Sequence, residues 1–320
     1  MALDRRTIAI AAGAAAVLAG WLIWRRESGA RCARHGRLVS RWSSVRGIRM
    51  HARVSIDAVP IGRPPVVLVH GLGMSSRYMV PLAKCLAADF RVHAPDLPGF
   101  GLSDKPCGAF SVGELADVLA AWMDEARIPR AAFVGNSLGC EILVDFALRY
   151  PGRVLSLVLQ GPTPDPAFLS PVRQIAHFFV TGLFERPSLG WVALSDYLRC
   201  GVRRYVSTFR DMIANRIEGK LPRIAAPTLV VWGTRDYLVP RRSAERVARL
   251  LPQGSLAVIP GAAHGINYSQ PGPLKDCVLD FVLGRGIEPG SPARRRGRRG
   301  RQEPSWRSLS RTPDPETRPR

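Results

Sequence analysis

The chain alternates short apolar runs with longer stretches in which apolar residues recur at helical spacing. The short runs predict strands at residues 66–69, 131–134, 154–159, 228–232 and 256–259. The longer stretches predict helices at residues 76–89, 112–126, 138–150, 241–251 and 274–283. Short strands alternating with helices indicate an α/β protein with a mostly parallel sheet and helices on both faces.

Ser137 lies at a predicted strand-to-helix junction, within the sequence Gly-Asn-Ser-Leu-Gly of residues 135–139. Glycines two positions before and after a serine permit a very sharp turn that pushes the hydroxyl outward. A larger residue at Gly135 or Gly139 would collide with the backbone. Five common residues are a weak signal alone, but their position directly after a strand indicates a nucleophilic serine.

An acid and a histidine follow in the order that such a serine requires. Asp236 comes just after the strand at 228–232, and His264 comes just after the strand at 256–259. Because the carboxyl ends of parallel strands share one edge of a sheet, Ser137, Asp236 and His264 are predicted to meet there. The histidine would act as the base that activates the serine, and the aspartate would fix the histidine tautomer.

Five segments, taken in order, resemble the motifs of the α/β-hydrolase superfamily: HGLG at 70–73, DLPGFGLSD at 96–104, GNSLG at 135–139, GTRDYLVP at 233–240 and GAAH at 261–264. The resemblance covers roughly residues 48–283. It implies an α/β-hydrolase fold, with a mostly parallel central sheet, helices on both faces and a helical cap. It also implies that the backbone N–H groups of Leu72 and Leu138 form an oxyanion hole.

Other polar residues near these motifs have alternative interpretations. Asp165 follows an earlier strand, from which some superfamily members take their acid, but the GTRD context favours Asp236. His70 is expected to shape the oxyanion loop rather than to act as a base. Asp96 and Asp104 are expected to fix the DLPGFGLSD loop, whose proline and glycines require special backbone angles.

The identity of the nucleophile narrows the chemistry. Haloalkane dehalogenases and epoxide hydrolases place an aspartate where this chain has Ser137, so the resemblance favours a serine hydrolase. The predicted substrate is a small carboxylic ester with an apolar acyl or alcohol group, cleaved through an acyl-enzyme. Meta-cleavage C–C bond hydrolases of dienoates share the serine triad but usually carry an aromatic residue where Gly265 follows His264. C–C hydrolysis, acyl transfer and a non-catalytic binding role stay open as alternatives.

Residues 163–225 resemble the helical cap of the superfamily, because more than sixty residues between two core strands exceed a plain connection. The apolar side chains of this segment are expected to form mostly cap core and a hydrophobic lining, and they include Phe168, Phe178, Phe179, Leu183, Phe184, Trp191, Tyr197, Tyr205 and Phe209. Such a lid suits an apolar ester. Three arginines are expected on a solvated face, with a carboxylate contact as the alternative: Arg199, Arg203 and Arg204.

Residues 7–24 carry no charge and include Trp21 and Trp24 near their end. About 18 apolar residues is near the minimum for a bilayer-spanning helix, and tryptophan is expected at the membrane interface. The segment predicts an uncleaved single-pass membrane anchor, with a cleaved signal peptide and a secreted or periplasmic protein as the alternative. Two arginines precede it and six follow by residue 41, which predicts a cytoplasmic catalytic domain.

The six cysteines lie scattered, without the spacing of a metal site or a CxxC motif. This predicts free thiols in a reducing compartment. Neither a metal nor a cofactor is expected.

The formal net charge of +21 gathers at the two ends of the chain. Residues 284–320 hold eleven basic and four acidic residues and are rich in Pro, Gly and Ser, which predicts a disordered tail. The tail could contact anionic lipid headgroups or remain simply solvated, and no fold that reads nucleic acid is indicated. The predicted organisation is a short basic N-terminus (1–6), an anchor (7–24), a basic linker (25–47), the hydrolase domain (48–283) and the tail (284–320).

Overall fold

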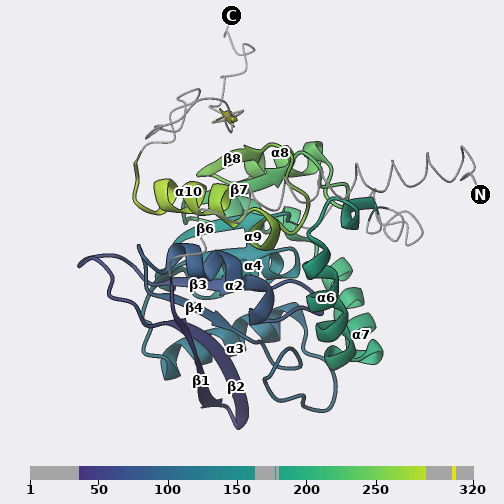
Figure 1. Ribbon diagram of the computed structural model, residues 1–320. Helices are drawn as coiled ribbons and strands as arrows, with labels where there is room; N and C mark the ends of the chain where they lie inside the picture. Colours follow the sequence, from purple (N-terminus) through teal and green to yellow (C-terminus); the bar gives the residue numbers. More distant parts are fainter. Residues whose placement is uncertain (1–35, 163–176, 178–179, 286–304, 308–320) are drawn as a thin grey trace, which may run out of the picture.

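A computed structural model describes residues 36–162, 177, 180–285 and 305–307 of the chain, and Figure 1 shows their arrangement. The strands are β1 (Leu38–Val45), β2 (Ile48–Ser55), β3 (Val66–Val69), β4 (Val92–Pro95), β5 (Ala131–Asn136), β6 (Val154–Gln160), β7 (Thr228–Gly233), β8 (Gly254–Ile259) and β9 (Ser305–Arg307). The helices are α2 (Ser76–Leu86), α3 (Val112–Glu125), α4 (Leu138–Arg149), α6 (Pro187–Cys200), α7 (Val202–Ala214), α8 (Arg241–Leu250), α9 (Ile266–Ser269) and α10 (Pro271–Val282). Short 3₁₀ turns are η1 (Pro151–Arg153), η3 (Ile217–Gly219) and η4 (Leu221–Arg223).

The strands form one sheet in the order β1-β2-β4-β3-β5-β6-β7-β8-β9. All neighbours from β4 to β8 are parallel, whereas β1–β2, β2–β4 and β8–β9 pair antiparallel. The predicted mostly parallel sheet is therefore confirmed. The chain leaves β3 towards β4 on one side and returns to β5 on the other, so the ends of β3 and β5 flank a topological switch point, where open α/β sheets bind ligands.

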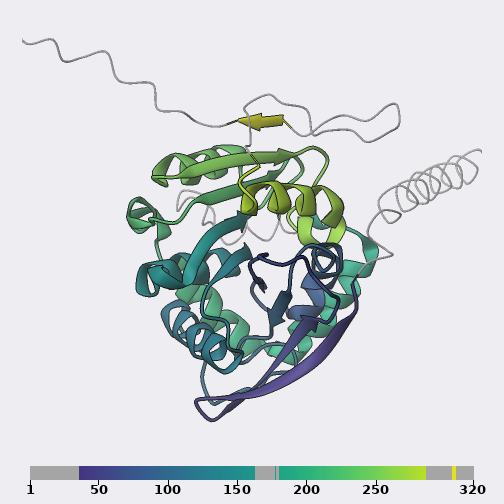
Figure 2. The ribbon, with the colours of Figure 1, turned by 90° about the vertical axis from the view of Figure 1, so that its left-hand side faces the viewer.

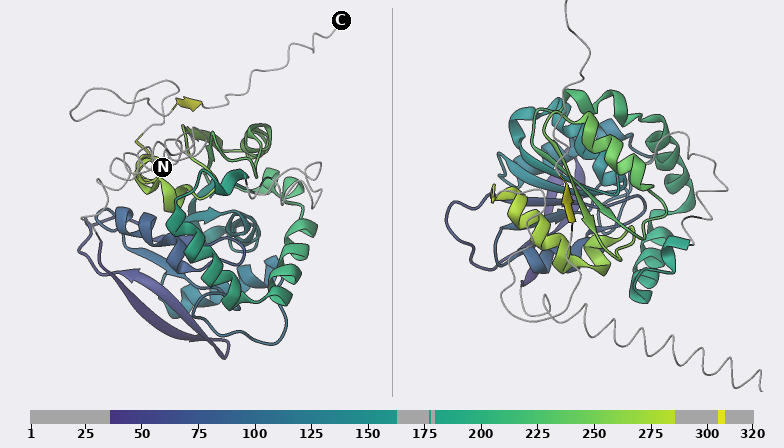
Figure 3. Two further views of the ribbon diagram at one scale, coloured as in Figure 1. Left: turned by 45° about the vertical axis from the view of Figure 1, so that its right-hand side comes forward. Right: turned by 90° about the horizontal axis from the view of Figure 1, so that it is seen from above.

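The central strands are buried on both faces, and their side chains alternate between two apolar clusters. In β3, Val67 and Val69 pack on the side of α3, α4 and α8, while Val66 and Leu68 pack on the side of α2 and α10. Period-two alternation in a wholly buried strand explains why its sequence reads as an uninterrupted apolar run. Figures 2 and 3 show the two helical layers on either side of the sheet.

The β1–β2 hairpin lies in sequence that did not predict strands, and all of β1 falls within the segment assigned to a basic linker. Its two-residue turn, Arg46 and Gly47, has φ of 51° and 78°, which matches the twist of a tight hairpin. The central residues of β1 are mostly exposed, so the strand lacks the apolar run that marks the buried ones. The hairpin is the long edge ribbon of Figure 1.

The described part of the predicted cap consists mainly of α6 and α7. Figure 1 shows these two helices beside the sheet, apart from the helices that cover its two faces. Polar contacts fasten the cap to the core. Ser75, the residue before α2, donates its hydroxyl proton to Asp196 of α6 over 2.6 Å. Lys220 Nζ donates to Asp145 of α4 over 2.8 Å. The cap is thus tied to helices that begin at the two loops flanking the switch point.

The cap side chains divide between packed and exposed positions. The rings of Tyr197 and Tyr205 meet edge to face with centroids 5.4 Å apart, and Tyr205 stacks on Phe209. Leu183 and Trp191, by contrast, are 81% and 76% exposed, so the expectation of a core position is wrong for these two residues. Three further aromatics lie outside the described residues: Phe168, Phe178 and Phe179.

The three cap arginines do not behave alike. Arg199 and Arg203 are exposed, as expected for a solvated face. Arg204 instead donates hydrogen bonds to the carbonyl oxygens of Pro106 and Gly108. It therefore fixes a loop of the core, a role that neither expectation included.

The predicted localisation requires a correction. No helix within residues 36–162, 180–285 and 305–307 is long and apolar enough to cross a membrane. Residues 7–24, on which the single-pass anchor and its cytoplasmic orientation rested, lie outside the described residues. The localisation as a single-pass membrane protein is therefore withdrawn.

The cysteine and tail predictions also need correction within the described residues. Cys107, Cys140, Cys200 and Cys277 are free thiols, but Cys85 of α2 is disulfide-bonded, which removes the cysteine argument for a reducing compartment. In the tail, β9 pairs with β8, so the prediction of no structure is wrong for residues 305–307. The remainder of the tail and its predicted lipid contact lie outside the described residues.

Candidate active site

Ser137 occupies a strained turn between β5 and α4. Its φ of 53° and ψ of −118° are unusual for a residue with a side chain, and such values are maintained only where the surroundings enforce them. Ser137 is the N-cap residue of α4, yet its hydroxyl makes no capping hydrogen bond. A serine at this position usually caps the helix, so the strained turn leaves this hydroxyl available for another role.

The two glycines of the motif are required by close backbone approaches. A Cβ atom on Gly135 would lie 2.8 Å from the carbonyl oxygen of Gly139, and one on Gly139 would lie 2.3 Å from the carbonyl oxygen of Val69. Both distances are shorter than any ordinary contact. Only glycine at both positions lets α4 start directly over the ends of β5 and β3.

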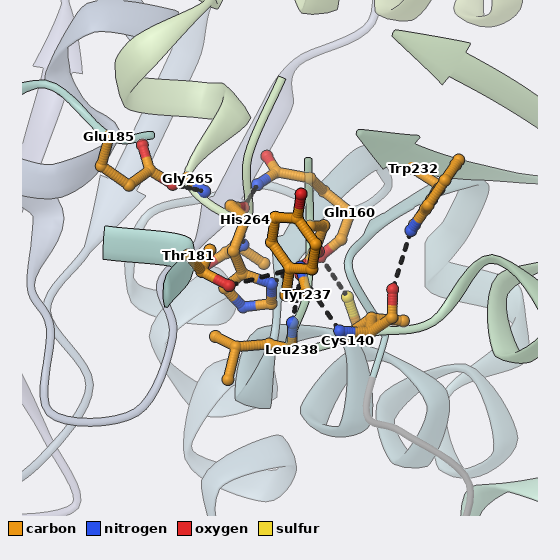
Figure 4. A network of polar contacts seen from close by, with 12 residues as sticks. Cys140, Gln160, Thr181, Glu185, Trp232, Tyr237, Leu238, His264 and Gly265 are labelled. Carbon is orange, nitrogen blue, oxygen red and sulfur yellow. Dashed lines mark hydrogen bonds and ion pairs between the residues drawn. The ribbon is translucent and has the colours of Figure 1, made fainter. Parts of the chain in front are cut away.

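Asp236 and His264 meet at the same edge of the sheet, after β7 and β8. The Nδ1 atom of His264 lies 2.8 Å from Oδ2 of Asp236. The other carboxylate oxygen accepts the N–H groups of Leu238 and Val239, each over 3.0 Å (Figure 4). With both oxygens held, the carboxylate has one orientation, and Nδ1 of His264 must carry a proton to bond with it.

Opposing effects set the basicity of His264. Burial by itself lowers its pKa, but the charge of Asp236 and the hydrogen bond to it outweigh burial, so the pKa lies above the usual value of 6.5. Its backbone carbonyl accepts the side-chain amides of Gln160 over 2.7 Å and of Asn136, the residue before Ser137, over 3.3 Å. The histidine loop and the serine turn are therefore joined through hydrogen bonds, and Figure 4 shows the one from Gln160.

His70 holds the loop after β3. Its Nε2 accepts the N–H of Leu97 over 3.1 Å, so Nδ1 carries the proton and donates to the carbonyl of Gly71 over 2.9 Å. Burial lowers the pKa of His70, which keeps the ring neutral. A Cβ on Gly71 would lie 3.4 Å from Cβ of Ser137, so this loop lies beside the serine. These contacts agree with the interpretation of His70 as a residue that shapes the loop.

The two residues predicted to supply oxyanion-hole donors lie on either side of the serine. Leu72 follows Gly71 in the loop after β3, and Leu138 is the first residue of α4. The first N–H groups of a helix have no acceptor within it, so the Leu138 N–H is free of the helical ladder. Both side chains are buried, which leaves the backbone as the chemically relevant part of each residue.

The other aspartates considered near the motifs have structural contacts or lie outside the described residues. Asp96 accepts hydrogen bonds from His51 Nδ1 over 2.9 Å and from the N–H of Leu102, also over 2.9 Å, so it fixes the loop that follows β4. Asp104 accepts the N–H of Arg49 in the β1–β2 hairpin over 2.8 Å. Asp165, the alternative acid, lies outside the described residues. Of the candidate acids that the structure describes, Asp236 is the one bonded to His264.

Cap side chains reach the loop after β3. A Cβ on Gly73, whose φ is +70°, would lie 2.6 Å from the ring of Tyr197 and 3.0 Å from the ring of Tyr205. Two aromatic rings of the cap thus cover the residue that follows Leu72.

Within the described part of the chain, no group of three or more His, Cys, Asp or Glu side chains could hold a metal ion.

Three positions near the site escaped the sequence reasoning. Gln160 ends β6 and binds the His264 carbonyl, and Gly161 follows it against the histidine ring. Gln160 and Gly161 lie at and just past the carboxyl end of a core strand, and the same kind of position identified Asp236. Glu185 of the cap, which contacts the backbone next to His264, carries no such signal in the sequence.

Comparison with known proteins places this fold in a family. Residues 64–187 match the sequence profile of the alpha/beta hydrolase fold. The chain is 28% identical over 277 residues to a 2-hydroxy-6-oxononadienedioate/2-hydroxy-6-oxononatrienedioate hydrolase of Cupriavidus pinatubonensis, covering 76% of this chain and 95% of that protein. It is also 28% identical over 254 residues to a pimeloyl-acyl-carrier-protein methyl ester esterase of Edwardsiella ictaluri, covering 71% and 96%.

A solved structure supports the same fold. The crystal structure of a membrane phospholipase A, described as a bacterial virulence factor, superimposes with a TM-score of 0.65. The match covers 87% of this chain and 96% of that one, at 23% sequence identity. At this identity the likeness concerns the fold alone.

Proposed function

The chain belongs to the α/β-hydrolase superfamily and is a hydrolytic enzyme, and from this premise we propose that it cleaves a carboxylic ester through an acyl-enzyme on Ser137. His264 acts as the general base and acid, and Asp236 orients it. The ester carries an apolar acyl or alcohol group. The esterase from Edwardsiella ictaluri is a relative with this type of chemistry in its name.

One observation carries the proposal: the backbone strain at Ser137. A φ of 53° is energetically costly for a residue with a side chain. Ser137 has this φ at the N-cap position of α4, yet its hydroxyl makes no capping hydrogen bond. A turn needed only for structure would be cheaper with glycine. The strain is explained if the hydroxyl must be presented at the switch point for reaction.

The proposed reaction proceeds in two halves. As Ser137 Oγ bonds to the ester carbonyl carbon, its proton passes to Nε2 of His264, and the carbonyl oxygen becomes an oxyanion near the N–H groups of Leu72 and Leu138. The bond to the alcohol oxygen then breaks, and His264 returns the proton to that oxygen. In the second half, water gives a proton to His264 as its oxygen bonds to the acyl carbon. The bond from that carbon to Ser137 Oγ then breaks, His264 returns the proton to Oγ, and the acid is released.

Cap residues support an apolar substrate. Tyr197 and Tyr205 lie against Gly73, next to the proposed oxyanion donor Leu72, so an acyl or alcohol group bound there would meet two aromatic rings. Burial raises the pKa of both phenols above the ordinary value of 10, so the rings stay uncharged at neutral pH.

Hydrolysis of a C–C bond is the second candidate, favoured by the relative from Cupriavidus pinatubonensis. The residue after the histidine argues for the ester. A Cβ on Gly265 would lie 2.9 Å from the Tyr78 hydroxyl and 3.0 Å from Glu185, so the aromatic residue usual there in C–C hydrolases does not fit. Acyl transfer to an acceptor other than water uses the same first half-reaction, and product analysis distinguishes it.

The test combines labelling with turnover. A fluorophosphonate probe should label the purified wild-type protein at Ser137, and p-nitrophenyl esters of graded chain length should be hydrolysed. Ser137→Ala should abolish both while circular dichroism shows an unchanged fold. The exposed Ser44→Ala is the matched control and should behave as wild type. Turnover that persists in pure Ser137→Ala protein would refute the proposed nucleophile, and turnover of a dienoate in preference to all esters would favour the second candidate.

A further inference from the structure

A short cap segment touches the residues that directly follow the proposed acid and base. Thr181 Oγ1 accepts the N–H of Tyr237, the residue after Asp236, over 3.3 Å. Glu185 Oε1 accepts the N–H of Gly265, the residue after His264, over 2.5 Å. Two residues only four positions apart in one segment thus contact two loops that lie far apart in the sequence, and Figure 4 shows both contacts.

Glu185 makes the stronger of the two connections. Its second oxygen, Oε2, accepts the hydroxyl proton of Ser269, at the end of the α9 turn that follows His264. The backbone N–H of the neighbouring Arg186 donates to the same Ser269 oxygen over 3.4 Å. The carboxylate therefore accepts hydrogen bonds at both ends of the short α9, the helix that follows His264.

Gly265 provides the space for this carboxylate. A Cβ atom there would lie 3.0 Å from Oε1 and 3.1 Å from Oε2 of Glu185, and 2.9 Å from the hydroxyl of Tyr78. The φ of Gly265 is −87°, a value that any residue adopts, so backbone conformation does not demand glycine. The close approach of Glu185 and Tyr78 is what a side chain at this position would disturb.

Packing holds the cap segment in place between the two contacts. Phe184 stacks on Tyr237 with ring centroids 5.6 Å apart, and the guanidinium of Arg235 lies 5.1 Å from the centroid of the Phe184 ring. Both partners flank Asp236. Hydrogen bonds and an aromatic contact therefore fasten residues 181–185 to the loop of the acid as well as to the loop of the base.

We propose that Glu185 is a positioning residue for the reaction, by which the cap holds His264 in place through the Gly265 N–H and Ser269. The inference rests on the proposed function of Ser137, Asp236 and His264. Its consequence is that the cap, besides lining the substrate site, completes the support of the general base. Detaching Glu185 would leave the His264–Gly265 backbone without its cap-side acceptor.

The charge of Glu185 also acts on the base. The titratable and charged groups facing it are His264, Asp236, Tyr78 and Arg186. Burial raises the pKa of Glu185, against the lowering effect of its hydrogen bonds from Ser269 and Gly265. While ionised, Glu185 adds to the effect of Asp236 in raising the pKa of His264. Removal of this charge should lower the pKa of His264.

The experiment compares four variants of the full chain with p-nitrophenyl esters. Glu185→Gln keeps the size of the side chain and removes its charge, and Glu185→Ala removes the acceptor altogether. Gly265→Ala should displace the carboxylate without touching it chemically. Glu245→Gln, at a surface ion pair with Arg241 on α8, is the control. The readouts are kcat, KM, the pH profile of kcat/KM and the pKa of the His264 imidazole by NMR.

We expect Glu185→Gln and Gly265→Ala to lower kcat about tenfold with KM changed less than about twofold, because misplaced catalytic groups mainly affect turnover. Both should move the acid limb of the pH profile, and the His264 pKa, to lower values, and Glu185→Ala should lose more activity. The proposal would be overturned if Glu185→Gln and Gly265→Ala both kept the wild-type kcat, the wild-type pH profile and the wild-type pKa of His264. A wild-type enzyme that cleaves no ester would instead refute the proposed function, and the NMR titration would still decide whether Glu185 acts on His264.

Discussion

The imidazole of His264 lies directly against the backbone of Gly161. A Cβ atom on Gly161 would be 2.8 Å from Cε1 and 2.9 Å from Nδ1 of the ring, and 3.3 Å from the Oδ2 atom of Asp236 that the ring contacts. Gly161 also has a φ of +57°, in the region that favours glycine. The end of β6 therefore forms one wall of the proposed acid–base pair.

Gly161→Ala should consequently disable the enzyme. The new methyl group would push His264 away from Asp236, and a displacement of about 1 Å can cost about a hundredfold in rate. The left-handed backbone adds a destabilisation of about 1–2 kcal/mol. The measurement is kcat/KM together with urea unfolding. Gly152→Ala is the control, because its Cβ would meet no atom within 4 Å, and it should retain full activity.

Removal of the acid provides a second prediction. Asp236→Asn should lower kcat by about 10⁴, as the corresponding change does in serine proteases, because an amide cannot fix the tautomer that places a free lone pair on Nε2. Asp165→Asn should cost far less. Steady-state kinetics of the two variants ranks them, and the opposite ranking would move the acid to the loop after β6.

The pH dependence follows from the same pair. His264 must be neutral to accept a proton, and its pKa is raised, after burial is outweighed by Asp236, above 6.5. The rate should therefore rise with pH through a midpoint above 6.5 and fall off on the acid side. Asp236→Asn removes the main raising influence, so its residual activity should have a midpoint at lower pH. A wild-type midpoint below 6.5 would contradict the expected balance.

Burial decided which elements the sequence could predict. Strand 66–69 was predicted with its observed bounds, because β3 is buried on both faces and its sequence is wholly apolar. The β1–β2 hairpin was missed because its residues are half exposed and many are polar. Its only strong local signal is the Arg46-Gly47 turn.

Some residues of the site could be predicted from the sequence and others could not. Ser137, Asp236 and His264 each follow a recognisable strand, so topology alone predicted that they share an edge. Glu185 could not be predicted, because its contact with Gly265 depends on how a cap segment returns over the sheet. Sequence spacing carries no information about that path, just as scattered cysteine spacing did not predict a disulfide at Cys85.

The cap aromatics should determine which esters the enzyme prefers. Tyr197→Ala would remove a ring that contacts the loop beside Leu72 and would open space next to the proposed oxyanion hole. We expect the preference to move towards longer or bulkier acyl groups, with KM for short esters rising several-fold. A series of p-nitrophenyl esters measures the shift. An unchanged chain-length profile would mean that the acyl group binds elsewhere.

A last prediction separates fold stability from support of the oxyanion loop, using two buried histidines. His70 satisfies the Gly71 carbonyl and the Leu97 N–H on either side of its ring. His93 of β4 packs edge to face against Trp122, and burial together with Arg91 lowers its pKa to about 4. Both rings are neutral at pH 7, but only His70 touches the loop next to Ser137.

His70→Ala should therefore lower both stability and turnover. Leaving two buried backbone groups without partners costs about 2–4 kcal/mol in unfolding free energy, and a relaxed Gly71 carbonyl would misplace the Leu72 N–H. Loss of one oxyanion donor reduces kcat by about 10²–10³. His93→Ala should lower stability through lost packing while kcat of the folded fraction stays at the wild-type value. Urea unfolding and active-site titration with the fluorophosphonate separate the two effects, and equal kcat in both variants would show that His70 serves the fold alone.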